Sequence, residues 1–348
     1  MSKDPSKAAS CSVPRDLRVM CQPDSGAGKA RPPLGLQAAL IRAGVDAKDF
    51  PVPQPLAKVL SRLRLVRPFS SAERRQSRGR TIMCASWGYA WWSLPDVWTR
   101  EIVPWCFDCW EPMFTLWDRT LRDLDSRDIF FSARDVIPHF SKSLARARCH
   151  WLPEAIEPGW MDPSKPLDER SIGVLELGRR LESFHDAITP ALQRSHVTHV
   201  YSKAGEQLFP GTEGVRTALA DTRVLVCHPK SMTHAGGPRG AGSIETVTQR
   251  YFEAFASRAL VVGHCPRELC DLFGFDPVIL SGEPIESVIE RIAEIARHPE
   301  RFQAHADRCY ERCLEVGTFD ARASSMLEIL SSSGSSDQLS NIASMAKE

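Results

Sequence analysis

The stretch from Arg223 to Gly263 decides the fold, and it reads RVLVCHPKSMTHAGGPRGAGSIETVTQRYFEAFASRALVVG. A short apolar run, Arg223–His228, is followed by a glycine-rich loop. A helical pattern over Ile244–Ser257 then leads to a second apolar run, Ala259–Gly263. Two such runs separated by a helix predict parallel strands joined by a right-handed crossover.

The same alternation continues on both sides of this unit. The flanking elements are predicted, in chain order, as strand Ser171–Gly178, helix Arg179–Leu192, strand His196–Ser202, helix Gly214–Ala220, helix Arg267–Phe273, strand Pro277–Ser281 and helix Pro284–Arg297. Repeated units of this kind predict the α/β class, with a doubly wound parallel sheet covered by helices on both faces.

The first part of the chain is less regular. Strands are predicted at Leu17–Cys21, Arg80–Cys84, Ile129–Ser132 and Arg148–Leu152, and a helix at Leu34–Ala43. This pattern permits a second Rossmann-like domain, and four prolines between residues 153 and 166 predict the break. We therefore expect two domains facing across a cleft. The predicted division is a disordered N-terminus (1–14), an N-terminal domain (15–160), a C-terminal domain (167–330) and a flexible Ser-rich tail (331–348).

Composition favours a globular protein, since 43% of the 348 residues are hydrophobic and 25% are charged. No run approaches the roughly 18–20 apolar residues that span a bilayer, and the N-terminus lacks the apolar core of a secretion signal. We therefore expect a cytoplasmic protein with reduced thiols. Cys106 and Cys109 form a C-x-x-C pair, but no second pair follows at zinc spacing, so we expect no metal.

The charge is unevenly distributed. Residues 1–80 hold 16 Lys and Arg against 6 Asp and Glu, although the whole chain has a net charge of +1. This basic part predicts either an anionic partner, such as a phospholipid surface or a lipid-linked phosphate, or a solvated basic face. Leu56, Val59, Leu60 and Leu63 form a short apolar stripe among basic residues. The stripe is typical of a core helix or of a helix at the inner membrane surface.

In an open parallel sheet, ligands bind beyond the carboxyl ends of the strands. The loop after Arg223–His228 contains Gly237, Arg239 and Gly242, and Ser243 is a plausible N-cap for the next helix. Backbone N–H groups at glycines and at a helix start suit a diphosphate, and Arg239 would add positive charge. A flexible loop without a ligand is the alternative.

Glu245 and Glu253 lie eight residues apart in the predicted helix. At about 100° per residue they fall within about 80° of one helix face, two turns apart. One carboxylate would then lie near the sugar or phosphates, and the other could accept two hydrogen bonds from a ribose diol. Two solvated surface carboxylates are the alternative.

Two segments carry a resemblance to a known family: RYFEAFASRALVV (residues 250–262) and PRELCDLF (residues 266–273). They resemble the donor-domain signature of glycosyltransferases with the two-Rossmann GT-B fold, most closely the subgroup related to spore-maturation glycosyltransferases. The Glu245/Glu253 spacing is similar to the retaining-type motif of that fold, and the resemblance covers about 160 residues. The chain departs from the pattern at Ser257-Arg258 and at Thr246-Val-Thr248.

The resemblance implies a retaining, metal-independent transferase whose donor is a nucleotide-diphosphate sugar and which needs no cofactor. It implies that Glu253 binds the ribose, that Arg250 belongs to the donor site, and that Arg179 or Arg180 neutralises the diphosphate. It leaves open UDP, GDP or dTDP as the nucleotide. A catalytically inactive binding or scaffold protein and a sugar-nucleotide epimerase are the alternatives.

The N-terminal domain should supply the acceptor side. Asp108 and His139 are possible acid/base groups. Tryptophans are dense between residues 87 and 117, and such rings either stack on sugars or pack in a core. The acceptor could be a glycan, a lipid-linked molecule or a small molecule, and we expect no nucleic-acid partner.

Overall fold

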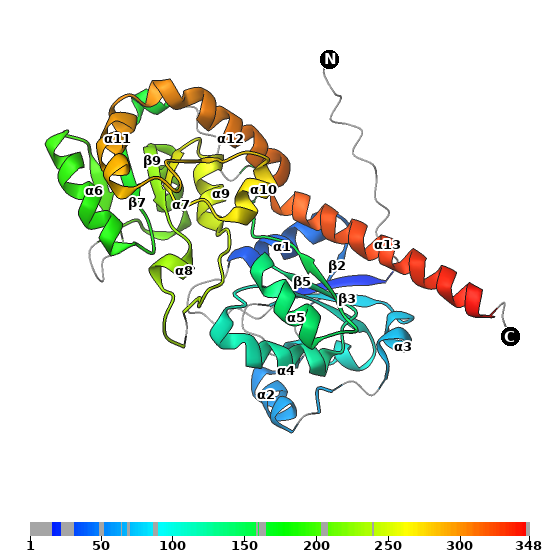
Figure 1. Cartoon of the computed structure of the whole chain (residues 1–348). Coiled ribbons are helices and arrows are strands. Elements are labelled where there is room, and N and C mark those ends of the chain that lie inside the picture. Colours follow the sequence, from blue (N-terminus) through cyan, green and yellow to red (C-terminus); the bar gives the residue numbers. More distant parts are fainter. Residues whose placement is uncertain are drawn as a thin grey trace, which may run out of the picture.

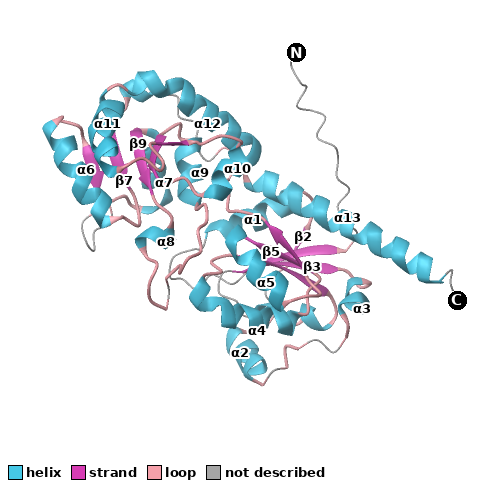
Figure 2. Cartoon of the chain, in the orientation of Figure 1, coloured by secondary structure: helices cyan, strands magenta, loops and turns pink. Residues whose placement is uncertain are grey.

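The computed structural model describes residues 16–21, 31–48, 52–63, 65–67, 70–85, 90–157, 159, 165–202, 208–238 and 240–345. The segment predicted to be disordered, residues 1–14, lies outside them. The chain forms two domains, each built on a parallel sheet flanked by helices (Figures 1 and 2). The predicted α/β class with two Rossmann-like sheets is confirmed.

The N-terminal sheet has six strands in the order β2-β1-β3-β4-β5-β6, all parallel. Its strands are β1 Leu17–Cys21, β2 Asp46–Ala47, β3 Arg80–Ala85, β4 Glu101–Cys106, β5 Asp128–Phe131 and β6 Arg148–Trp151. Its helices are α1 Arg31–Arg42, α2 Gln54–Arg62, α3 Ala72–Gln76, α4 Phe114–Leu124 and α5 Ile137–Ser143. All six residues of β4 are buried, so this unpredicted strand is central to the domain.

The C-terminal sheet has five parallel strands in the order β11-β10-β9-β7-β8. Its strands are β7 Ile172–Glu176, β8 His199–Tyr201, β9 Thr222–Cys227, β10 Leu260–Gly263 and β11 Val278–Ile279. The helices are α6 Glu182–Arg194, α7 Gly211–Ala220, α8 Lys230–Thr233, α9 Gln249–Ala256, α10 Arg267–Phe273, α11 Ile285–Arg297, α12 Gln303–Val316 and α13 Phe319–Met345. The predicted elements of this domain are confirmed, with shifted ends.

The largest shift concerns α9, which begins at Gln249 rather than at Ile244. The preceding residues 244–248 are not helical, and alternate backbone N–H groups donate to side-chain carboxylates. The pairs are Ser243 with Glu111 (2.8 Å), Glu245 with Asp135 (3.2 Å), Val247 with Glu268, and Gln249 with Glu154 (2.7 Å). Because a helix would turn these groups away from their acceptors, the carboxylates keep residues 244–248 out of the helix. Three of the four acceptors belong to the N-terminal domain, so this segment also ties the two domains together.

The last helix, α13, returns to the N-terminal domain and lies along α1 (Figure 1). Phe319, Met326 and Leu330 are buried in the core between α13, α1 and the sheet. A Cβ at Gly35 would approach the Phe319 ring to 2.3 Å, so a glycine permits this close packing. Arg80 also donates to the Leu330 carbonyl (2.8 Å). Helix α13 continues from this packed part through the Ser-rich segment to Met345. The flexibility expected for residues 331–348 stays a prediction.

The apolar stripe predicted between Leu56 and Leu63 lies on and just after α2 and is a core face only in part, since Leu60 packs against the N-terminal core. Leu56, Val59 and Leu63 are 52%, 48% and 64% exposed, whereas Ala57 is buried. Contact of this stripe with a membrane surface stays a prediction. Among the helices described, none has the length and apolar character needed to cross a bilayer.

Candidate functional site

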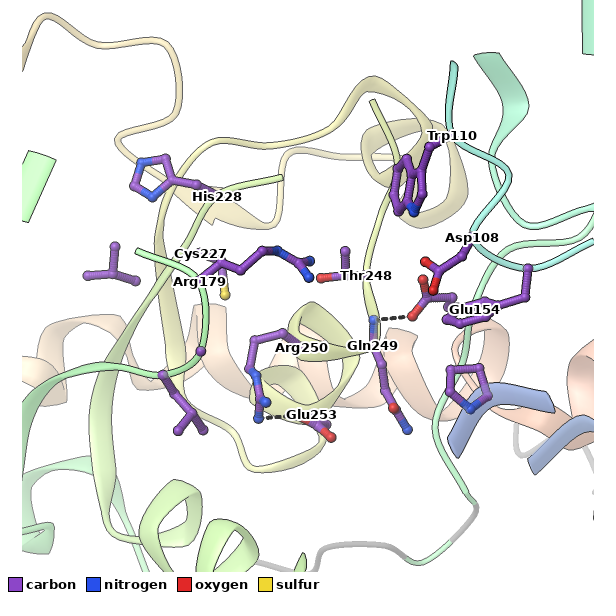
Figure 3. Close-up of a pocket in the computed structure, with 15 residues that line it drawn as sticks. Asp108, Trp110, Glu154, Arg179, Cys227, His228, Thr248, Gln249, Arg250 and Glu253 are labelled. Atoms are coloured by element: carbon purple, nitrogen blue, oxygen red, sulfur yellow. Dashed lines mark hydrogen bonds and ion pairs between the residues drawn. The ribbon is translucent and has the colours of Figure 1, made fainter. Parts of the chain in front are cut away.

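A cavity of about 350 Å³ lies between the two domains, at the carboxyl ends of both sheets (Figure 3). That volume falls within the range of small-ligand pockets, about 300–1,000 Å³. The residues that line it are Pro32, Phe107, Asp108, Trp110, Glu154, Leu177, Gly178, Arg179, Val226, Cys227, His228, Thr248, Gln249, Arg250 and Glu253. The position is the one in which open parallel sheets bind ligands.

The C-terminal domain contributes a basic wall to the cavity. Arg179 follows strand β7, and its side chain reaches across the cavity beside Thr248 (Figure 3). Arg250 and Glu253, one turn apart on α9, form an ion pair, and Glu253 is only 2% exposed. The first turn of α9 also faces the cavity, and the N-terminus of a helix attracts anions. Two guanidinium groups and a helix start make this wall suitable for a diphosphate.

The N-terminal domain contributes an acidic and aromatic wall. Asp108 follows strand β4 and has a left-handed backbone (φ 57°). Aspartate tolerates this conformation better than most residues, and the turn brings its carboxylate to the cavity. Trp110 lies next to it, and the Lys230 ammonium sits 4.3 Å from the centre of the Trp110 ring. This cation–π contact joins α8 of one domain to the wall of the other.

Glu154 occupies the point where the chain passes between the domains. Its side chain accepts the Gln249 N–H, and its backbone carbonyl accepts a hydrogen bond from Arg322 (3.4 Å). Two residues later, Ile156 pairs with Thr318, so the segment entering the C-terminal domain and the segment leaving it lie side by side. Glu154 lines the cavity and is only 5% exposed, so its carboxyl group is largely shielded from water.

Burial shifts the proton affinities of several cavity groups. It raises the pKa of Glu154 to about 8, with a further contribution from the nearby Asp108 carboxylate. Burial also raises the pKa of Asp108, although Lys230 and Arg179 oppose the shift. Burial lowers the pKa of His228 to about 4, so this ring is neutral at pH 7. The cavity thus contains a carboxyl, Glu154, that is mostly protonated at neutral pH.

Glu154 makes stability depend on pH in a definite direction. Its folded pKa of about 8 lies above the ordinary value of 4.5, so its contribution is complete below pH 4.5 and is lost as the pH rises through 8. Glutamine stays neutral and keeps a carbonyl oxygen for the Gln249 N–H. We therefore expect the Tm of Glu154→Gln, relative to wild type, to rise between about pH 5 and pH 9. The measurement is thermal unfolding across that range.

The control for this experiment is Glu213→Gln on α7, where the side chain is 79% exposed. Its Tm should follow the wild-type Tm at every pH. A Glu154→Gln curve parallel to wild type would show that Glu154 is ionised throughout, which contradicts the assignment.

The structure does not bring Glu245 into the cavity. One oxygen of Glu245 accepts the Arg267 N–H (2.9 Å), and the other lies 2.8 Å from His264 Nε2. The hydrogen bond with His264 lowers the pKa of Glu245, so the group is a stable carboxylate. Because α9 begins only at Gln249, Glu245 and Glu253 do not share a helix face, and that prediction is wrong.

The glycine-rich loop also lies apart from the residues that line the cavity. Gly237 is exposed with φ 83°. Gly242 has φ 62°, and a Cβ there would meet the Glu111 carboxylate at 2.2 Å. Ser243 donates to Glu111 through its N–H and its hydroxyl instead of capping a helix. Arg239 lies outside the described residues. The predicted role of this loop in binding phosphate has no support from the lining of the cavity.

Two further candidates take part in surface pairs. Arg180 binds Glu182 (2.8 Å) and lies over the Tyr201 ring, so of the two adjacent arginines only Arg179 lines the cavity. His139 stacks on Phe114 (4.4 Å) and contacts Asp118 (3.2 Å), away from the cavity lining. The Cys106 and Cys109 thiols are buried in the N-terminal core.

The structure gathers four predicted residues at one site: Asp108, Arg179, Arg250 and Glu253. Their catalytic and binding roles stay predictions. Sequence reasoning missed Glu154 and His228. His228 ends a predicted strand at the carboxyl edge of the sheet, a position that could have drawn attention to it. Glu154 stands in the proline-rich hinge, where no periodic pattern exists.

Residues 190–328 match a protein-family model described as "Glycosyl transferase-like". This match covers most of the C-terminal domain and the start of α13. A search of the curated proteins found no match. The resemblance seen in the donor-domain segments is confirmed.

Solved structures share the fold over nearly the whole chain. A glycosyltransferase from Rickettsia africae has a TM-score of 0.53 at 9% identity, covering 90% of this chain and 96% of that protein. Sucrose-phosphate synthase from Thermosynechococcus elongatus has a TM-score of 0.56 at 11% identity, covering 92% and 100%. HepE from Anabaena, in complex with UDP and glucose, has a TM-score of 0.54 at 12% identity, covering 91% and 100%. Identities this low show the fold alone, which is GT-B.

Proposed function

Since the chain has the GT-B fold and its residues 190–328 match a glycosyl transferase-like family model, we propose that it moves a sugar from a nucleotide-diphosphate sugar to an acceptor. One observation carries the proposal. Arg179, Arg250 and Glu253 of one domain face Asp108 and Glu154 of the other across a single cavity. A donor held on the basic wall would present its sugar to an acceptor bound on the opposite wall.

On the donor side, the buried Glu253 carboxylate is the group suited to a ribose diol, because a carboxylate can accept two hydrogen bonds from adjacent hydroxyls. Arg250 holds that carboxylate in place through their ion pair. Arg179 lies beside Thr248, the residue before α9, where the diphosphate would meet a guanidinium at the positive end of the helix dipole. UDP is the first nucleotide to test, since the similarly folded HepE was solved with UDP.

The position at which negative charge develops during the transfer reaction determines which residues can assist it. As the glycosidic bond breaks, negative charge grows on the leaving diphosphate, and fixed cationic donors at that position lower the barrier. Arg179 and the α9 N-terminus supply such donors, which supports a mechanism that needs no metal. On the acceptor side, Asp108 would orient the attacking hydroxyl, and the face of Trp110 offers a surface for a sugar ring.

We further propose that the anomeric configuration is retained. The support for retention is the resemblance of the donor-domain segments to retaining glycosyltransferases; Glu245 itself lies outside the cavity.

The expected result is that purified protein, given a UDP-sugar and a panel of acceptors, forms a glycoside with the anomeric configuration of the donor. Proton NMR of the product measures the anomer directly. A product of the opposite anomer would contradict retention of configuration, but it would still show that the sugar is transferred. Conversion of the donor alone, without an acceptor, would identify an epimerase instead.

A further inference from the structure

A second cluster of chemically active side chains lies inside the C-terminal domain, behind the loop that carries Arg179. It consists of Glu176 at the end of β7, His185 on α6 and His199 at the start of β8. One oxygen of Glu176 lies 2.5 Å from His185 Nδ1 and 2.8 Å from His199 Nε2. We infer that this cluster is a binding site for a zinc ion.

The fold explains why these three residues meet. In the parallel pairing of β7 with β8, His199 is opposite Val174 and Tyr201 is opposite Glu176. Because side chains alternate along a strand, Glu176 and His199 point to the same face of the sheet. His185 reaches that face from α6, where its ring lies 5.5 Å from the His199 ring. Each ligand therefore comes from a different, rigid element.

The donor set fits zinc. Two imidazoles and one carboxylate form a common zinc-binding set that leaves a fourth position open. The three donor atoms all lie within 4.8 Å of one another. With bond lengths of about 2.0–2.2 Å, a tetrahedral ion needs its ligand atoms about 3.4 Å apart, so the carboxylate oxygen must withdraw by less than about 1 Å.

The burial of this cluster favours a bound metal ion. The side chains of Glu176 and His199 are 4% and 5% exposed. A divalent ion would compensate the buried Glu176 charge and fix both rings. Only Leu177 and Gly178 separate Glu176 from Arg179, so the ion would also fix the position of the loop that carries Arg179. The role of that loop in donor binding rests on the proposed function.

The test uses the full chain, with any affinity tag removed, after dialysis against EDTA and then against ZnCl₂. Elemental analysis after gel filtration should find about one zinc per chain, and zinc should raise the Tm of the protein. His199→Gln should lose that zinc. The matched controls are His298→Gln, an exposed histidine, and Cys270→Ser, which removes a ligand from the other potential metal cluster, Cys265–Cys270–Asp276. Both controls should keep the zinc.

Should His199→Gln not fold, the wild-type protein still decides the question. Cobalt added in place of zinc should give the visible absorption of a tetrahedral ion with nitrogen and oxygen ligands, without the thiolate charge-transfer band that a cysteine site produces. Wild-type protein that retains no zinc, or zinc that leaves with Cys270→Ser and stays with His199→Gln, would overturn the assignment. None of these measurements depends on glycosyl transfer, so they fail or succeed separately from the proposed function.

Discussion

Arg179→Gln is expected to lower kcat/KM for the sugar nucleotide by about 100- to 1,000-fold, the usual effect of removing a fixed donor from a developing negative charge. Arg179 lies between the first turn of α9 and the acidic wall, where a leaving diphosphate would gain its charge. Glutamine keeps a hydrogen-bond donor but removes the positive charge. Steady-state kinetics with a saturating acceptor measure the effect.

Two comparisons sharpen this prediction. Arg216→Gln removes an arginine from the surface of α7 in the same domain and should leave kcat/KM unchanged. Arg180→Gln should have a much smaller effect than Arg179→Gln, because Glu182 already binds its guanidinium. If the Arg180 variant were the more damaged of the two, our placement of the diphosphate would be wrong.

Glu253→Gln is expected to weaken nucleotide binding by about 10- to 100-fold, which corresponds to the loss of about 1.5–3 kcal/mol of charged hydrogen bonding. The carboxylate is buried and paired with Arg250, so the substitution removes the ribose acceptor and leaves Arg250 without its counter-charge. Isothermal titration with UDP measures the change in Kd.

The matched control for Glu253 is Glu213→Gln. Glu213 and Arg216 form the same i,i+3 pair on α7, but they lie at the surface and outside the cavity. This variant should bind the nucleotide like wild type. Wild-type affinity in Glu253→Gln, with the fold intact by circular dichroism, would remove Glu253 from the site.

The sequence predicts the C-terminal domain well because its strands are buried apolar runs between amphipathic helices. Helix α10, for example, has the predicted bounds Arg267–Phe273. Strand β4 escapes prediction because Glu101 and Pro104 interrupt its pattern, and a proline argues against a central strand. The buried Glu101 is accommodated by an ion pair with Arg80 (3.2 Å), a long-range contact that spacing does not reveal.

The start of α9 shows a second limit of the sequence. Local propensity places Glu245 and Glu253 on one helix, whereas carboxylates from distant segments keep residues 244–248 out of the helix. Tertiary contacts override the local pattern there, and they move Glu245 away from the cavity. The sequence does not predict Glu154 for the same reason. Its position at the cavity results from tertiary structure, where two segments that connect the domains lie side by side.

The most direct measurement is a calorimetric titration of the wild-type protein with UDP, GDP and dTDP. We predict that one of them binds at a single site with a Kd of about 1 mM or tighter, and that Arg179→Gln and Glu253→Gln each weaken this binding while Arg216→Gln does not. Absence of binding by all three, or binding that is equal in every variant, would contradict the claim that this cavity holds a sugar nucleotide.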